Sequence, residues 1–85
     1  MHGGPLMVFK KRNKEIAKQV LSKKTYRVVA GRYDLSRERV RRITISLCNK
    51  VVPEIVAQAK AGMRTVNMRV LRNHAEEIIP LIDMM

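Results

Sequence analysis

Residues 25–50 read TYRVVAGRYDLSRERVRRITISLCNK, and this stretch decides the expected fold. Thr25 can cap a short helix from Tyr26 to about Tyr33, because its hydroxyl can accept a hydrogen bond from a free N-terminal amide. The next three residues, 34–36, have the composition of a turn. Ser36 can then cap a longer helix to about residue 50, whose core stripe is Val40, Ile43, Leu47 and Val51. The stretch therefore predicts two helices joined by a tight turn, which is a helix-turn-helix pattern.

The face of the longer helix that lies opposite this stripe is polar and mostly basic. An arginine fork can bind guanine O6 and N7, a glutamate can accept from cytosine N4, and an isoleucine can touch a thymine methyl group. Such a helix can enter the major groove of DNA when the preceding helix presents it. The predicted base contacts, on this face or beside it, are Arg37, Glu38, Arg41, Arg42, Ile45 and Asn49.

Charge is concentrated in the first half of the chain. The 85 residues carry 18 Lys and Arg against 7 Asp and Glu, a formal net charge of +11. Residues 10–42 hold thirteen basic and three acidic residues, whereas residues 43–85 hold five basic and four acidic ones. A field of this kind favours a polyanionic partner, and we expect double-stranded DNA. The residues predicted to contact phosphates are Lys10, Lys11, Arg12, Lys14, Lys18, Lys24, Ser36 and Arg39.

Residues 25–50 also resemble conserved region 4 of bacterial sigma factors, the helix-turn-helix that reads promoters. The resemblance rests on Thr25, Ala30, Tyr33, Leu35, Ser36 and the run Arg37-Glu38-Arg39-Val40-Arg41-Arg42-Ile43. It implies that Arg37, Glu38, Arg41 and Arg42 face bases or backbone, and that Thr25 and Arg27 meet phosphates. Asp34 replaces the turn glycine of the family, and Arg42 replaces its glutamine, which would shift base preference toward guanine or phosphate. We expect a stand-alone bacterial or phage regulator rather than a sigma factor.

The remainder of the chain predicts further helices. Residues 1–9 are expected to be a flexible arm, and Asn13 to cap a helix through about Ser22 that buries Ile16, Ala17, Val20 and Leu21. The helix after Thr25 is expected to turn Val28 and Val29 inward. Pro53 suits the first turn of a fourth helix. Gly62 can end it, Thr65 can cap the next, and Pro80 is expected to end regular helix. Asn73 and Glu76 could form a capping box or lie within a helix.

The chain is thus expected to be all-α, with a helix-turn-helix head at residues 10–52 and a helical segment at 53–85. That segment is nearly neutral and apolar. A heptad-like seam, Val52, Val56, Ala59, Met63, Val66 and Val70, could pair two copies or pack back to complete the core. The predicted dimer or core residues are Val56, Ala59, Met63, Val66, Val70, Ile78 and Ile79. We expect a homodimer, because one three-helix head makes few contacts with DNA.

Other classes of function are disfavoured by the sequence. No nucleophile–base pair or phosphate loop is recognisable, so we expect no enzyme and no cofactor. Cys48 is expected to be a buried apolar residue and His74 a surface or interface residue, so we expect no metal. No apolar run is long enough to span a membrane, and a lone cysteine fits a reducing cytoplasm.

Three hypotheses about function remain. The first is a sequence-specific DNA-binding transcriptional regulator that acts as a homodimer. The second is a protein-interaction module that binds RNA polymerase or another transcription factor, as the resemblance implies. The third is a non-specific nucleic-acid-binding protein, which a steep salt dependence without sequence preference would indicate.

Overall fold

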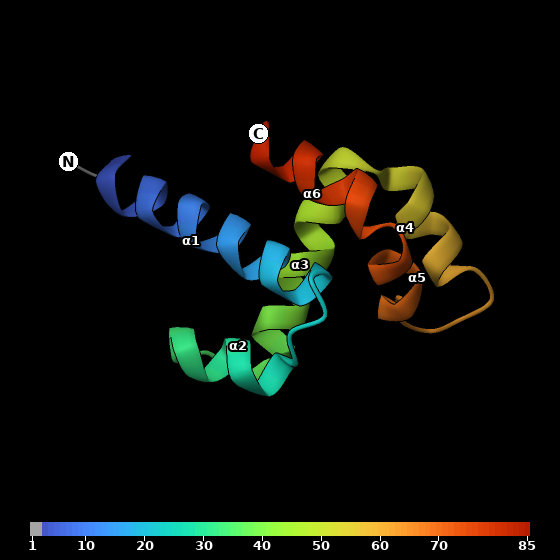
Figure 1. Cartoon of the computed structure of the whole chain (residues 1–85), viewed down its shortest axis with the longest axis horizontal. Coiled ribbons are helices and arrows are strands. Elements are labelled where there is room, and N and C mark those ends of the chain that lie inside the picture. Colours follow the sequence, from blue (N-terminus) through green and yellow to red (C-terminus); the bar gives the residue numbers. More distant parts are fainter. Residues whose placement is uncertain (1–2) are drawn as a thin grey trace.

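The computed structural model describes residues 3–85, with side chains from Lys10 onward, and this part of the chain is helical without strands. Its helices are α1 (Gly3–Leu21), α2 (Tyr26–Tyr33), α3 (Arg37–Val51), α4 (Pro53–Lys60), α5 (Met68–Asn73) and α6 (Ala75–Asp83). In the view of Figure 1, α3 lies at the centre, between α1 and α2 on one side and α4 to α6 on the other. The all-α prediction is confirmed for the described residues.

Helix α1 is longer than the sequence predicts. It begins at Gly3 instead of Asn13, so residues 3–9, expected to be an arm, form its first turns, and residues 1 and 2 lie outside the described residues. Its predicted inner face is confirmed, because Ile16, Ala17, Val20 and Leu21 are all buried. The helix ends with Lys23 in the left-handed region, where its amide donates to the Val20 carbonyl and the Lys24 amide to the Gln19 carbonyl. This pair of bonds is a Schellman motif.

The corner between α2 and α3 has the predicted caps. The Thr25 hydroxyl accepts from the Val28 amide at 3.3 Å, and the Ser36 hydroxyl accepts from the Arg39 amide at 3.1 Å. Asp34 adopts φ 56° and ψ 46°, a left-handed conformation that Asp tolerates better than most residues. The Leu35 amide then donates to the Ala30 carbonyl, so α2 ends and α3 starts after a three-residue turn. Val28 is 50% exposed, and its inward placement was wrong.

The buried face of α3 is rotated relative to the stripe of residues that the sequence predicted to be buried. Val40 and Leu47 are buried as expected, but Ile43 and Val51 are half-buried, while Thr44 and Cys48 are fully buried. The Thr44 hydroxyl donates to the Val40 carbonyl at 2.9 Å, which satisfies it within the core. The face is broad because α3 packs against four other helices, α1, α2, α4 and α6.

The second half of the chain confirms some boundaries and corrects others. Pro53 occupies the first turn of α4, and Gly62 follows that helix with φ 69°. The cap of α5 is Asn67, whose side chain accepts from the Arg69 amide, and not Thr65. No side-chain cap precedes α6, so Asn73 and Glu76 form no capping box. Pro80 lies inside α6 rather than at its end, because the helix must continue for Ile78 and Ile82, four residues apart, to share one buried face.

Residues 53–85 complete the core of the single chain. Leu71, Ile78 and Ile82 are fully buried in one cluster with Ala17 and Leu21 of α1 and Leu47 of α3. Of the residues predicted for a dimer or the core, Val56, Ala59 and Ile78 are buried and Val66, Val70 and Ile79 are half-buried. Met63 is 50% exposed, because the chain leaves helix after Lys60 and the heptad seam is interrupted there.

Candidate nucleic-acid interface

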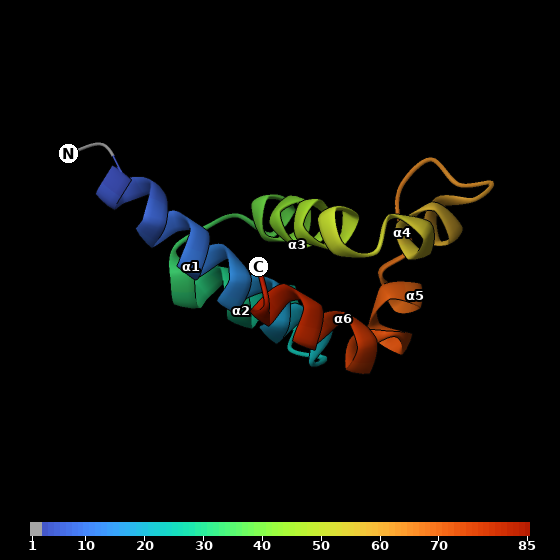
Figure 2. The same cartoon turned by 90° about the horizontal axis from the view of Figure 1, so that it is seen from above.

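The amino-terminal half of α3 is exposed over most of its outer surface. Arg37, Glu38, Arg39 and Arg42 are exposed, whereas Arg41 is half-buried. Figure 2 shows α3 along one edge of the molecule, with α1, α2 and α6 on its other side. Arg37, Arg39 and Arg42 are therefore available to a partner, whereas Arg41 is partly covered by the fold.

Glu38 organises two of these arginines. Its Oε2 atom lies 3.2 Å from Nε of Arg42 and 3.7 Å from Nη1 of Arg41. The side chain of Arg42 is 76% exposed, so this pair is solvated and weak, and its guanidinium can exchange the carboxylate for another acceptor. The side chain of Arg41 is only 23% exposed, so most of its surface is covered by the fold. Of these two guanidinium groups, that of Arg42 is therefore the more accessible to a partner.

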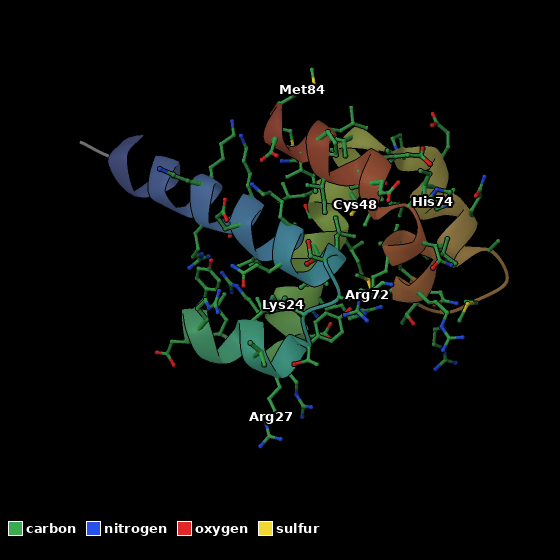
Figure 3. All side chains as sticks on the ribbon, in the orientation of Figure 1. Lys24, Arg27, Cys48, Arg72, His74 and Met84 are labelled. Atoms are coloured by element: carbon green, nitrogen blue, oxygen red, sulfur yellow. The ribbon has the colours of Figure 1, made fainter. Side chains whose placement is uncertain are left out.

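A depression of about 670 Å³ lies beside the turn between α2 and α3. It is lined by Arg27, Ala30, Leu35, Ser36 and Arg37. Figure 3 shows the Arg27 side chain pointing away from α2 into solvent. The predicted phosphate contacts Arg27 and Ser36 are thus brought next to Arg37 at the amino terminus of α3, where an anion is electrostatically favoured. Thr25 is also exposed, and its hydroxyl already serves as a cap.

The face of α3 that carries Arg41 and Ile45 borders a groove. A groove of about 340 Å³ is lined by Glu38, Arg41, Arg42, Ile45, Ser46, Lys60, Arg64, Thr65 and Val66. A neighbouring depression of about 320 Å³ continues it past Asn49 toward Pro53 and Val56 of α4. Ile45 is half-buried against the larger core cluster, which explains an isoleucine on a basic face without a thymine contact. Asn49 is exposed within this groove.

The sequence reasoning missed Lys60 and Arg64. They lie eighteen or more residues beyond Arg42, in a segment that was assigned to a dimer or core role, yet they line the same groove as Arg41 and Arg42. The sequence predicted that a helix could end at Gly62, but Met63 and Val66 after it were still assigned to a dimer or core role. The break at Gly62, where the chain adopts a positive φ, was the available signal for an exposed loop.

Several predicted phosphate contacts on α1 are occupied within the fold. Lys14 donates to the Met85 carbonyl, and Nζ of Lys18 lies 2.7 Å from Oδ1 of Asp83 and 3.2 Å from Oε2 of Glu15. The Asp83 and Glu15 hydrogen bonds raise the pKa of Lys18 above its usual value. Arg12 hydrogen-bonds to Asn13, and Lys10 and Lys11 are exposed. Lys14 and Lys18 therefore join α1 to the carboxyl-terminal residues.

Arg72 is a second residue that the sequence did not reveal. Its Nε donates to the Val20 carbonyl at 3.1 Å, its Nη2 to the Lys24 carbonyl at 3.3 Å, and its guanidinium lies 5.4 Å from the centre of the Tyr26 ring. Figure 3 shows it reaching the connection between α1 and α2. It adds a second donor to the Val20 carbonyl, binds the Lys24 carbonyl in the connection, and so ties α5 to the start of α2. No local pattern connects residues 20 and 72.

Cys48 lies in the core, and His74 pairs with a neighbouring carboxylate. Burial raises the pKa of the Cys48 thiol to about 11. Nδ1 of His74 lies 3.1 Å from Oε1 of Glu77 on the surface of α6. Among the described residues, no three His, Cys, Asp or Glu side chains are grouped closely enough to hold a metal ion.

Comparisons of this chain with known protein families, curated proteins and solved structures found no significant match. Within residues 3–85, none of the helices has the length and apolar character needed to cross a bilayer.

Proposed function

We propose that this protein binds double-stranded DNA and reads its sequence with α3. The observation that carries the proposal is the uncovered amino-terminal half of α3, where Arg37, Arg39 and Arg42 are exposed directly after a three-residue turn from α2. Helix-turn-helix proteins place this part of the second helix of the motif against base edges in the major groove.

Each exposed side chain has a role in this proposal. Arg42 and Arg37 supply forks that suit guanine, and Glu38 can accept from cytosine N4. Arg27, Arg39 and Lys24 are exposed at the edges of the same corner and bind phosphates. The weak, exposed ion pair between Glu38 and Arg42 leaves both side chains free to exchange partners when DNA binds.

The resemblance of residues 25–50 to sigma factor region 4 supports the same assignment. The residues that carry it include Thr25 and Ser36, which cap α2 and α3. Asp34 departs from the family's turn glycine, but it adopts a left-handed conformation. The resemblance also implies RNA polymerase as a partner, which co-purification from a bacterial extract tests separately.

Pairing of two copies is a separate part of the proposal. Most of the residues predicted for a dimer are used in the core of one chain, and exposed apolar side chains remain at Met63, Leu81 and Met84. Sedimentation of the free protein and of its DNA complex gives the number of copies directly. A single copy in both would remove the homodimer without affecting the contacts of α3.

The experiment for this function is selection of bound duplexes from a random pool, followed by binding to the selected duplex and to a scrambled one. The proposal expects an enriched sequence and a preference of at least about 10³-fold for it at physiological salt. Equal affinity for both duplexes, with a steep dependence on salt, would instead indicate a non-specific nucleic-acid-binding protein.

A further inference from the structure

We infer that residues 60–67, which are the last residue of α4 and the loop from α4 to α5, form a second DNA-contacting element whose Lys60 and Arg64 bind phosphates beside α3. This inference rests on the proposed function and adds a contact that neither the helix-turn-helix pattern nor the charge distribution along the sequence predicts.

The position of the loop is the first argument. Lys60, Arg64 and Thr65 line one groove together with Arg41 and Arg42 of α3, although more than fifteen residues separate the two groups. Figure 2 shows the loop projecting from the end of α4 on the side of the molecule where α3 lies. A duplex whose major groove received the amino-terminal half of α3 would have a phosphate strand running past this loop.

The charge of the loop is the second argument. Lys60 and Arg64 are both exposed, and residues 61–67 contain no acidic residue. The acid that lines the groove is Glu38, and its carboxylate is already paired with Arg41 and Arg42. The groove thus carries four cationic side chains against one carboxylate, an excess that suits a phosphate backbone.

The rigidity of the loop is the third argument. The Asn67 amide donates to the Ala59 carbonyl at 2.9 Å and closes the base of the loop, and the Met63 amide donates to the Lys60 carbonyl at 2.9 Å within it. Gly62 supplies the left-handed conformation, and Val66 is half-buried against the larger core cluster. The backbone at Lys60 and Arg64 is therefore held beside the groove before DNA binds, so less backbone entropy is lost on binding.

The test compares two charge-matched double variants. K60Q/R64Q removes the two loop cations, and K50Q/R69Q removes two exposed cations that do not line the groove. Affinity for the selected duplex and for a scrambled duplex is measured at several KCl concentrations. Circular dichroism verifies that both variants keep their helices, which we expect because all four side chains are exposed.

We expect K60Q/R64Q to weaken binding to both duplexes by the same factor, about tenfold or more, and to leave the preference between them unchanged. The slope of log K against log salt should become shallower by about 1.8, since each phosphate contact contributes about 0.9. K50Q/R69Q should change the slope by less than about 0.5 on the same scale.

The inference would be overturned if K60Q/R64Q lost no more affinity than K50Q/R69Q and changed the slope of log K against log salt by no more than that variant does. If the unaltered protein still prefers the selected duplex in that case, the proposed reading by α3 stands and the loop contact alone is rejected. If the unaltered protein binds neither duplex, the proposed function and the loop contact are both rejected.

Discussion

Arg72 shows, at the scale of single residues, how a cation can serve the fold in a protein with a high positive charge. It donates to the Val20 and Lys24 carbonyls and lies over Tyr26. We expect Arg72→Met to lower the free energy of unfolding by about 1–3 kcal/mol, because two charge-assisted hydrogen bonds to backbone carbonyls are lost. Urea denaturation measures this. Arg69→Met, which removes an exposed arginine of the same helix, is the control, and an equal loss in both variants would contradict the role assigned to Arg72.

The buried thiol of Cys48 predicts a dependence of stability on pH. Its pKa rises to about 11 in the folded protein from an ordinary value of 9.0, so the folded state favours the protonated thiol. The stabilisation is complete below about pH 9 and is lost as the pH rises through about 11. Relative to Cys48→Ala, the unaltered protein should lose up to about 2 kcal/mol between pH 8 and pH 10.5. A constant difference between the two proteins over this range would show that the thiol is not shielded from water.

At the scale of elements, α6 tests whether the second half of the chain completes the core. Ile78 is fully buried against α1 and α3, whereas Leu81 is 37% exposed on the same helix. We expect Ile78→Ala to cost about 2–5 kcal/mol, enough to unfold much of a small domain, and Leu81→Ala to cost less than half as much. Thermal denaturation at several protein concentrations measures both. If instead Leu81→Ala cost more, and its cost depended on concentration, α6 would act chiefly between two chains.

The elements also show how much of the fold is predictable from the sequence. Thr25, Ser36 and Pro53 marked helix starts correctly, because a cap is a local interaction between neighbours in the chain. Pro80 was wrongly read as a helix end, since the burial of Ile78 and Ile82 outweighs the hydrogen bond that proline cannot make. Asn13 was a plausible cap, but α1 continues back to Gly3. Local signals located most boundaries and failed where tertiary packing decides.

At the scale of the whole molecule, the charge excess divides into two groups that the sequence could not separate. Lys14, Lys18 and Arg72 hold the carboxyl-terminal helices against α1, through contacts between residues more than fifty positions apart. Arg27, Arg37 and Arg42 remain exposed around the corner of α2 and α3. The outer face of α3 and its arginines could be predicted from the sequence, because helical periodicity is a local pattern. The sequence could not predict Lys60 and Arg64, because their place beside α3 depends on the path of the chain after α4.

The central claim, that α3 reads bases, is tested most directly by Arg42→Ala. Its affinity for the selected duplex and for a scrambled duplex is compared with that of Arg69→Ala, which removes an exposed arginine away from α3. We expect Arg42→Ala to weaken binding to the selected duplex by about 1–3 kcal/mol and to reduce the preference between the duplexes, whereas Arg69→Ala leaves the preference unchanged. Equal losses of Arg42→Ala on both duplexes, with the preference intact, would contradict base reading by α3.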